Sequence, residues 1–260
     1  MKTISGRDNK ILKHTKKLAV TSYRAKTGEF IVEGERLCLE ALFCNARISY
    51  AIISETFGRE NEHFQKKLDN CNVNVYTVPD KLFDDISKTD TPQGVLFVVK
   101  QPNEEAVNFD DVSRVLLLDG LAEPGNMGTI IRTASSFGFS SIILCNNCVD
   151  IYNPKVVRST MGGIFRTNFA KPSNITETTS NLKSAGFQIV AAALENSVDI
   201  NSIKFGEKVA LIIGNEANGI SDELLKLSDV NVKIPMANDV ESLNAAVAAG
   251  IAMYLGREQI

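Results

Sequence analysis

Short apolar runs separated by helix-length segments are the clearest pattern in the second half of the chain. They cover residues 115–118, 142–144, 189–193, 210–213 and 232–234. Buried runs of this length that alternate with helices are typical of a mainly parallel sheet with helices on both faces. The pattern therefore predicts an α/β fold in which ligand-binding groups lie at the carboxyl ends of the strands.

The first hundred residues show a weaker alternation of the same kind. Apolar or β-branched runs predict strands at residues 30–32, 49–54, 73–78 and 94–99. Apolar spacing predicts helices at residues 8–20, 33–43, 60–68 and 79–86. Residues 101–111 are polar and acidic and lack periodicity, which indicates a linker. We therefore expect a smaller α/β domain at residues 1–100 and a larger one at residues 112–260.

The composition excludes several classes of protein. With 260 residues, 44% of them hydrophobic, the chain can bury two modest cores. It has no apolar run of ~18 residues and no apolar signal core near Met1, so we expect a cytoplasmic protein without a membrane partner. Five cysteines, an odd number, fit a reducing compartment. Cys145 and Cys148 form a C-x-x-C that closes an apolar run, and the two histidines lack paired spacing, so we expect no metal site.

Positive charge is concentrated at the start of the chain. The net charge is −3, but residues 1–26 hold eight basic residues and one acidic residue, which leaves −10 on the remainder. A basic start on an acidic body is typical of contact with a nucleic acid. The candidate contacts are Arg7, Lys10, Lys13 and Arg24. A solvated helix face without a partner remains the alternative on charge alone.

Polar residues follow the first of the apolar runs in the larger domain. Pro124 and Gly125 make a turn, after which Asn126 is well placed to cap a helix. Arg132 lies about six residues into that helix, where its guanidinium fork could bind phosphate. A capped helix with an ordinary surface arginine explains the same residues equally well.

Two later segments repeat this arrangement. Gly214 and Gly219 let the backbone approach a ligand closely, with Glu216 between them either used in a site or facing water. Ser242 and Asn244 precede an alanine-rich helix that is either a core helix or a subunit contact, and they could merely cap it. The segments contain no G-x-G-x-x-G fingerprint, P-loop or Ser-His-Asp pattern, which argues against dehydrogenases, phosphoryl transfer and hydrolysis.

Taken in this order, the three segments resemble the motifs of the SpoU (TrmH) family of RNA 2′-O-ribose methyltransferases, in the SPOUT superfamily. The matching stretches are N-M-G-T-I-I-R-T-A at 126–134, I-I-G-N-E-A-N-G at 212–219, and I-P-M and S-L-N-A-A-V-A within 234–248. Residues 157–166 resemble the usual sequence between the first two motifs. Residues 5–100 resemble, more loosely, the substrate-binding domain of this family, which is similar to ribosomal protein L30e.

The resemblance implies a cofactor, an assembly and a fold that patterning alone does not. It implies S-adenosylmethionine (AdoMet) bound in a deep trefoil knot, largely by backbone, and a homodimer. The implied cofactor-binding residues are Ala193, Gly214, Asn215, Ile234, Met236 and Leu243. The implied catalytic residues are Arg132, Asn126, Glu216, Ser242 and Asn244, and no metal is implied.

The implied reaction is methylation of a ribose 2′-hydroxyl of RNA, with 23S ribosomal RNA favoured. Because a guanidinium stays protonated, we expect Arg132 to bind the adjacent phosphate and stabilise the developing alkoxide, while that phosphate or a water takes the proton. Transfer RNA is the alternative substrate, and methylation of a base nitrogen is the alternative chemistry. A non-catalytic RNA-binding protein that retains the fold is the alternative from another class.

Overall fold

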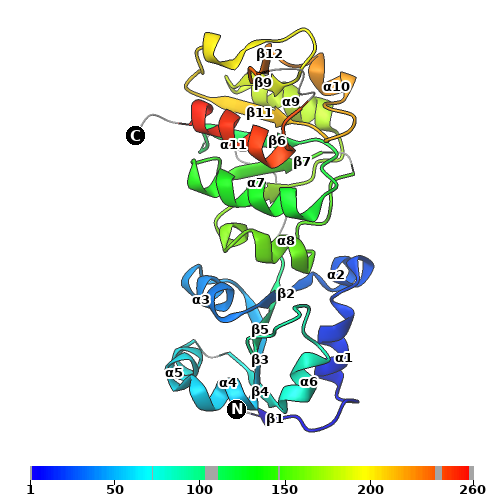
Figure 1. The fold of residues 1–260 in the computed structure, drawn as a ribbon, viewed down its shortest axis with the longest axis vertical. Coiled ribbons are helices and arrows are strands. Elements are labelled where there is room, and N and C mark those ends of the chain that lie inside the picture. Colours follow the sequence, from blue (N-terminus) through cyan, green and yellow to red (C-terminus); the bar gives the residue numbers. More distant parts are fainter. Residues whose placement is uncertain (1, 72, 103–110, 146, 238–241, 258–260) are drawn as a thin grey trace. The chain divides into compact units, whose positions relative to one another are not determined.

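The chain forms two compact units in the computed structural model, which describes residues 2–71, 73–102, 111–145, 147–237 and 242–257 (Figure 1). The first unit contains residues up to 102 together with residues 150–165, and the second contains residues 103–149 and 166–260. Most of the expected linker, residues 103–110, and residues 238–241 of the third motif segment lie outside the described residues.

The first unit is built on a five-stranded sheet with strand order β1-β4-β3-β5-β2. The strands are β1 (Lys2–Thr3), β2 (Glu29–Glu33), β3 (Ile48–Ser54), β4 (Val75–Val78) and β5 (Val95–Lys100). Strand β5 runs antiparallel to both β2 and β3, and the other pairs are parallel. The helices are α1 (Lys10–Lys17), α2 (Thr21–Thr27), α3 (Glu35–Phe43), α4 (Glu55–Glu60), α5 (Glu62–Asn70) and α6 (Asp80–Asp84).

Helices cover both faces of this sheet, with α1, α2 and α6 on one side and α3, α4 and α5 on the other (Figure 1). Leu12 and Leu18 of the α1 region pack on Ile31 and Leu96, which point to that side of the sheet. The predicted basic helix at 8–20 ends earlier than expected, at Lys17, and α2 begins at Thr21. The predicted strands all form, whereas the two-residue β1 was not foreseen.

The second unit is built on a seven-stranded sheet with strand order β10-β12-β9-β11-β6-β7-β8. The strands are β6 (Arg114–Leu118), β7 (Ser141–Leu144), β8 (Asn168–Ala170), β9 (Gln188–Ala192), β10 (Val198–Asp199), β11 (Val209–Ile213) and β12 (Val230–Lys233). Every pair of neighbours is parallel. The helices are α7 (Pro124–Ser136), α9 (Ile175–Ser184), α10 (Asp222–Leu225) and α11 (Ala245–Gly256).

The core of this sheet explains why its strands appear as continuous apolar runs. Alternate residues such as Leu117 and Ile212 pack against Leu182 of α9 and Leu224 of α10. The remaining residues of the same strands are also buried, because α11 packs on β11 and α7 packs on α11. The predicted parallel sheet with helices on both faces is therefore confirmed, while the trefoil knot stays a prediction from the resemblance.

Residues 150–165 lie between strands β7 and β8 along the chain. They contain helix α8 (Pro154–Ser159) and the 3-10 turn Gly163–Phe165, and they cluster with the first unit. The sequence analysis placed this segment in the larger domain, at residues 112–260. Within the described residues, no helix is both long and apolar enough to cross a membrane.

Candidate active site

The first motif begins the helix that carries two of the predicted catalytic residues. Helix α7 begins at Pro124, with Glu123 as its N-cap, and the Glu123 carboxylate accepts a hydrogen bond from the Asn126 backbone N–H at 2.6 Å. The prediction that Asn126 caps this helix is therefore wrong. Proline is well suited to the first helical position because it lacks the N–H that would need a partner. The cap lies three residues earlier than expected, and this leaves the Asn126 side chain available for other contacts.

The side chain of Asn126 joins the three motif segments. Its Nδ2 donates a hydrogen bond to Oε1 of Glu216 at 2.6 Å, and its Oδ1 accepts one from Nδ2 of Asn244 at 3.0 Å. Asn244 also caps α11, since its Oδ1 accepts bonds from the backbone N–H groups of Ala246 and Val247. Three of the predicted catalytic residues, separated by up to 118 positions in the chain, thus form one hydrogen-bonded cluster. We call Asn126, Glu216 and Asn244 the motif cluster.

Arg132 is exposed on α7, apart from the motif cluster. It lies about 9 Å further along the helix axis and about 120° around it from Asn126, at ~1.5 Å and ~100° per residue. Its carbonyl accepts a hydrogen bond from Ser136 Oγ, and its side chain makes no hydrogen bond or ion pair with the part of the chain that the structure describes. The guanidinium donors are therefore open to a ligand from solvent. Ser242 is also exposed, in the segment before α11.

The second motif folds back on itself after β11. Asn215 and Gly219 exchange two backbone hydrogen bonds, at 2.9 and 3.0 Å. The side chain of Asn215 accepts bonds from the N–H groups of Ala217 and Asn218 and donates one to the carbonyl of Gly120. The polar atoms of the Asn215 side chain thus shape the loop that presents Glu216, and the assignment of Asn215 to cofactor binding stays a prediction.

Gly214 is the residue that permits this tight loop. A Cβ atom there would lie 2.4 Å from the carbonyl carbon and oxygen of Gly219 and 2.6 Å from the backbone nitrogen of Ile220. Non-bonded carbon contacts are favourable only near about 3.5–4.0 Å. Glycine is thus required at this position because the backbone of Gly219 and Ile220 approaches it closely. The sequence analysis expected glycine here to admit a ligand, whereas the close neighbour in the structure is the protein's own backbone.

Sequence reasoning missed Asp119, which connects the first and second motifs. It follows β6 directly, is buried, and its Oδ2 accepts a hydrogen bond from the backbone N–H of Ser221 at 2.8 Å, at the start of α10. The signal was present in the sequence, because a carboxylate directly after a buried strand is costly unless it has a partner. The sequence analysis considered the cost of such a buried charge for Glu216 and not for Asp119.

The remaining predicted cofactor residues lie at the carboxyl ends of neighbouring strands. Ala193 follows β9, Gly214 follows β11 and Ile234 follows β12, and these three strands are adjacent in the sheet. Ala193 N–H donates to the carbonyl of Val232 at 3.0 Å, which holds two of the strand ends together. Ile234, Met236 and Leu243 are partly exposed apolar side chains outside regular structure. Such an edge, where strand-end backbone lies beside apolar side chains, suits the flat ring of an adenine nucleoside.

The C-x-x-C pair has a structural role. Burial raises the pKa of the thiols of Cys145 and Cys148 above the usual range, so the reactive thiolate is disfavoured at both. The Cys148 Sγ lies 3.2 Å from the carbonyl of Leu118. These features fit two small side chains that follow the end of strand β7.

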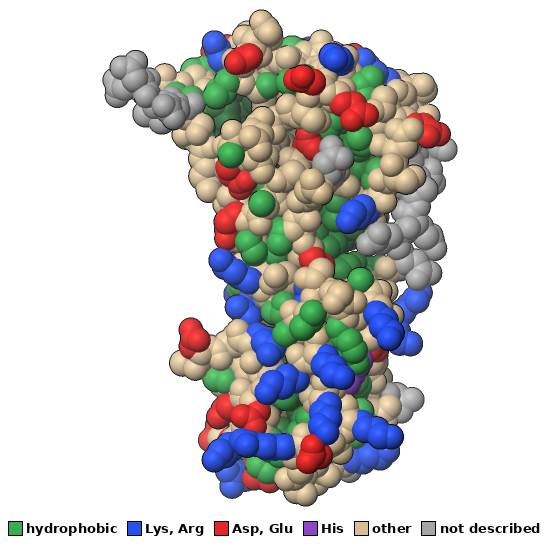
Figure 2. All heavy atoms as spheres, turned by 90° about the vertical axis from the view of Figure 1, so that its right-hand side faces the viewer, with side chains coloured by type: hydrophobic (Ala, Val, Ile, Leu, Met, Phe, Trp, Pro, Cys, Tyr) green, Lys and Arg blue, Asp and Glu red, His purple; other side chains and the backbone are tan. Residues whose placement is uncertain are grey.

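Most of the predicted RNA contacts are exposed on the first unit. Lys and Arg side chains gather on the face formed by α1 and α2 (Figure 2). Lys10 and Lys13 are exposed there, and Arg7 forms an ion pair with Asp85 at 2.9 Å while remaining mostly exposed. Lys100 adds a cation that sequence analysis missed. It pairs with Glu29 across β5 and β2, and Glu29 bonds to His14 of α1, so Lys100 lies on the same face of the sheet.

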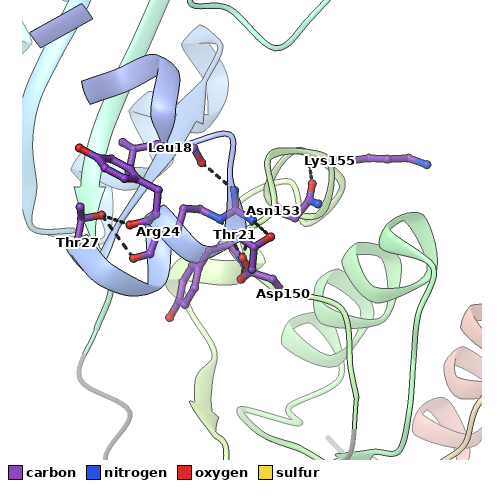
Figure 3. A network of polar contacts seen from close by, with 9 residues as sticks. Leu18, Thr21, Arg24, Thr27, Asp150, Asn153 and Lys155 are labelled. Atoms are coloured by element: carbon purple, nitrogen blue, oxygen red, sulfur yellow. Dashed lines mark hydrogen bonds and ion pairs between the residues drawn. The ribbon is translucent and has the colours of Figure 1, made fainter. Parts of the chain in front are cut away.

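Arg24 is the exception, and its prediction as an RNA contact is wrong. Its side chain is 1% exposed. Its guanidinium donates to Asp150 from Nε and Nη2 at 2.9 and 2.6 Å, to the carbonyl of Leu18 at 2.8 Å and to Thr21 Oγ1 at 2.9 Å (Figure 3). Four of the five guanidinium N–H donors, and the charge, are therefore used inside the protein and not on a phosphate.

Comparison with known proteins agrees with this architecture. Residues 113–254 match the SpoU rRNA Methylase family, and residues 9–96 match the MRM3-like substrate binding domain. The chain is 34% identical to the 23S rRNA (guanosine(2553)-2′-O)-methyltransferase RlmP of Bacillus subtilis over 98% of both chains. It is 29% identical to rRNA methyltransferase 3A, mitochondrial, of Danio rerio, over 97% of this chain and 69% of that protein.

Solved structures give the same result. The AdoMet-bound rRNA methyltransferase from Sinorhizobium meliloti superposes with a TM-score of 0.87 at 31% identity, covering 98% of this chain and 97% of that one. The SpoU methyltransferase AviRb from Streptomyces viridochromogenes, in complex with AdoMet, superposes with a TM-score of 0.83 at 26% identity, covering 95% and 97%. The predictions of the family, of the α/β fold and of an AdoMet-dependent RNA methyltransferase are confirmed. The chain belongs to the SpoU rRNA methylase family.

Proposed function

We propose that this protein transfers the methyl group of AdoMet to a ribose 2′-hydroxyl of 23S ribosomal RNA, and that it acts as a homodimer in the cytoplasm. The observation that carries the proposal is the motif cluster, in which Asn126, Glu216 and Asn244 from three distant segments meet at hydrogen-bonding distance. The choice of 23S RNA is supported by the name of the Bacillus subtilis relative, which matches this chain over 98% of its length.

The chain's own residues supply orientation and charge for this reaction. AdoMet, when bound, supplies an electrophilic methyl group on a sulfonium. We propose that backbone groups and apolar side chains at the edge of the sheet hold it, from residues Ala193, Gly214, Asn215, Ile234, Met236 and Leu243. Holding the nucleophile and the methyl group in line in a closed site reduces the barrier by fixing their geometry in advance.

The 2′-hydroxyl must lose or share its proton as it attacks, and Arg132 stabilises the charge that develops. Because a guanidinium stays protonated, it is unsuited to accept that proton. We propose that Arg132 binds the neighbouring phosphate and the developing alkoxide, and that the phosphate or a water accepts the proton. The motif cluster and Ser242 orient the ribose, with the amide of Asn126 fixed on both sides by Glu216 and Asn244.

The first unit binds the RNA substrate. The exposed cations of α1, together with Arg7 and Lys100, form a basic face to which the phosphate backbone is attracted. The match of residues 9–96 to an MRM3-like substrate binding domain supports this role. Lys10 and Lys13 are the contacts that we propose from both charge and exposure.

A second copy of the chain covers an apolar face of α11. This helix is apolar on all sides, and Val247 and Tyr254 are each 51% exposed. Tyr254 also packs edge-on against Phe137 of α7, with ring centroids 5.7 Å apart. Exposed apolar side chains that lie together on a helix with small residues fit a helix-to-helix contact between subunits.

Replacement of Arg132 tests the proposed reaction. Arg132→Ala is expected to reduce transfer of labelled methyl from AdoMet to 23S RNA by about a hundredfold or more, as loss of a group that stabilises transition-state charge does. AdoMet affinity, measured by isothermal titration calorimetry, is expected to stay within about twofold. Arg59→Ala, which removes an exposed arginine of the first unit, is the matched control and is expected to keep full activity.

Nucleoside mass spectrometry of the treated RNA distinguishes the alternatives. A 2′-O-methylnucleoside is the expected product, and a base-methylated nucleoside would contradict the proposed chemistry. Methylation of transfer RNA without methylation of 23S RNA would contradict the proposed substrate. RNA binding by the wild-type protein without any methyl transfer would identify a non-catalytic RNA-binding protein. Retained turnover in Arg132→Ala would overturn the role of that residue.

A further inference from the structure

The α1–α2 face of the first unit carries apolar side chains among its cations. Hydrophobic side chains lie between the Lys and Arg side chains that gather there (Figure 2). Val20, in the turn between the two helices, is 55% exposed, and the ring of Tyr23 in α2 is partly exposed. We call Val20 and Tyr23 the apolar corner. Both residues belong to the first unit, as do all of their contacts described below.

Local stability does not explain Val20. It occupies the N-cap position of α2, where its side chain makes no capping hydrogen bond. Ser, Thr, Asp and Asn are strongly preferred at this position, and valine is among the least suitable residues there. A side chain that is more than half exposed also gains little from burial. A residue that breaks a local preference without a packing gain is typical of a functional position.

The turn that carries Val20 is fixed from inside the protein. Nη1 of Arg24 donates a hydrogen bond to the carbonyl of Leu18 at 2.8 Å, and Nη2 donates one to Thr21 Oγ1 at 2.9 Å (Figure 3). The guanidinium itself is held by Asp150, at 2.9 and 2.6 Å. The carbonyl of Leu18 ends α1 and has no partner within that helix. Arg24 therefore holds the residues on both sides of Val20 and keeps the valine facing solvent.

Tyr23 is fixed beside Val20. The N-cap and N3 side chains of a helix lie close together, which is why they can cap each other's backbone, and Tyr23 is the N3 residue of α2. A hydrogen bond of 2.9 Å joins its hydroxyl to Nδ1 of His14, whose Nε2 lies 2.8 Å from Oε2 of Glu29. The ammonium of Lys17 lies 5.8 Å from the centre of the tyrosine ring. A valine, an aromatic ring and a cation are thus held together at the surface.

A row of cations leads to the apolar corner. Lys10, Lys13 and Lys17 are exposed and lie on one side of α1, because residues three and four apart share a helix face. Val20 follows one turn later, and its N–H donates to the carbonyl of Lys17 at 3.0 Å. Cations bind the phosphates of any RNA, whereas an unpaired base also offers a flat face on which side chains can pack. The row and the corner together therefore fit a strand of RNA that contains an unpaired base.

We propose that the apolar corner binds the face of an unpaired RNA base, while the lysines of α1 bind the neighbouring phosphates. This inference rests on the proposed RNA-binding role of the first unit. It assigns unpaired RNA to this face, because side chains do not reach the faces of bases that are stacked in a duplex. Val20 then contributes to RNA affinity without contributing to its salt dependence, which comes from the phosphate contacts.

Replacement of Val20 in the full chain tests the inference. Val20→Ser removes the apolar contact and supplies a hydroxyl that can cap α2, so the unfolding temperature is expected to stay the same or rise. Its affinity for an RNA hairpin with an unpaired loop, measured by fluorescence anisotropy, is expected to fall about tenfold. Its affinity for a fully paired RNA duplex of the same length is expected to stay within about twofold. The slope of log hairpin affinity against log salt concentration is expected to stay unchanged.

Two further variants complete the test. Phe43→Ser is the matched control, because Phe43 is 78% exposed on α3, on the other side of the sheet (Figure 1), and both affinities are expected to stay unchanged. Val20→Thr keeps nearly the same volume and one methyl group, so its hairpin affinity is expected to lie between those of Val20→Ser and wild type; it serves if Val20→Ser does not fold.

Three results would overturn the inference. They are hairpin affinity within twofold of wild type in the folded Val20 variants, equal loss of hairpin and duplex affinity, and a shallower salt slope in Val20→Ser. A wild-type protein that binds the duplex as tightly as the hairpin would also overturn it. A wild-type protein that binds neither RNA refutes instead the proposed RNA-binding role of the first unit.

Discussion

Gly214 gives the sharpest stability and binding prediction in the proposed AdoMet site. In Gly214→Ala the added methyl would lie 2.4 Å from the carbonyl group of Gly219 and 2.6 Å from the nitrogen of Ile220. Both neighbours are backbone, so no side chain can rotate out of the way. The loop at residues 214–220 must therefore open, or the edge of the sheet must shift, to accommodate the added methyl group.

The size of the effect follows from what must give way. Opening the loop breaks the two hydrogen bonds between Asn215 and Gly219, at about 1 kcal/mol each. Keeping them leaves an overpacked contact that costs about 1–3 kcal/mol. By either route the wild-type loop becomes less favourable by about 2 kcal/mol. If AdoMet binds that conformation, its population falls about 30-fold and the apparent affinity falls with it.

Isothermal titration calorimetry with AdoMet measures this loss directly. Gly206→Ala is the matched control, because a Cβ at Gly206 would make only ordinary contacts, at 3.5 Å from Gln188 and from Lys208. The control is expected to bind AdoMet as the wild type does. If Gly214→Ala binds AdoMet within twofold of wild type, the loop is not part of the cofactor site as proposed.

Two further predictions concern the RNA face and the subunit contact. In the first, Lys10, Lys13, Lys16 and Lys17 are replaced with Gln. The magnitude of the slope of log RNA affinity against log salt concentration is expected to fall by about 3, since each phosphate contact contributes about 0.7–0.9. An unchanged slope would assign RNA binding to another surface. In the second, Val247→Glu is expected to raise the dimer dissociation constant about 30-fold or more in sedimentation equilibrium, because it buries a charge in the contact. Phe43→Glu, a control on the first unit, is expected to leave that constant unchanged. A wild-type protein that sediments as a monomer would contradict the proposed dimer.

The strands were predictable where burial on both faces leaves a continuous apolar run. Strands β6 and β11 are buried at every position, so their apolar sequences identify them as strands without knowledge of the neighbouring strands. Strand β8 was missed because Phe169 is its one buried residue, and β10 because both of its residues are exposed. Short edge strands owe their conformation to a neighbour, and a local pattern carries no information about that neighbour.

The site was predictable as a set of segments but not as a set of contacts. Strand ends followed by turn residues indicated three segments, and residues from all three meet in the motif cluster because parallel strands end at one edge of the sheet. Spacing could not tell that Glu123, not Asn126, caps α7, since either residue can accept a backbone hydrogen bond at a helix start. The choice depends on Glu216 and Asn244, which are near Asn126 only after folding.

Arg24 shows where reasoning from charge fails and what replaces it. In the sequence it is one of eight basic residues near the start of the chain, and nothing distinguishes it from Lys10 or Lys13. The distinction comes from Asp150, which lies 126 positions away. The buried Arg24 guanidinium has already exchanged water for the partly exposed Asp150 carboxylate, so it has no free charge to attract phosphate. A basic cluster in the sequence therefore sets an upper limit on the number of RNA-binding residues, and loss of the buried member should leave the salt dependence of RNA binding unchanged.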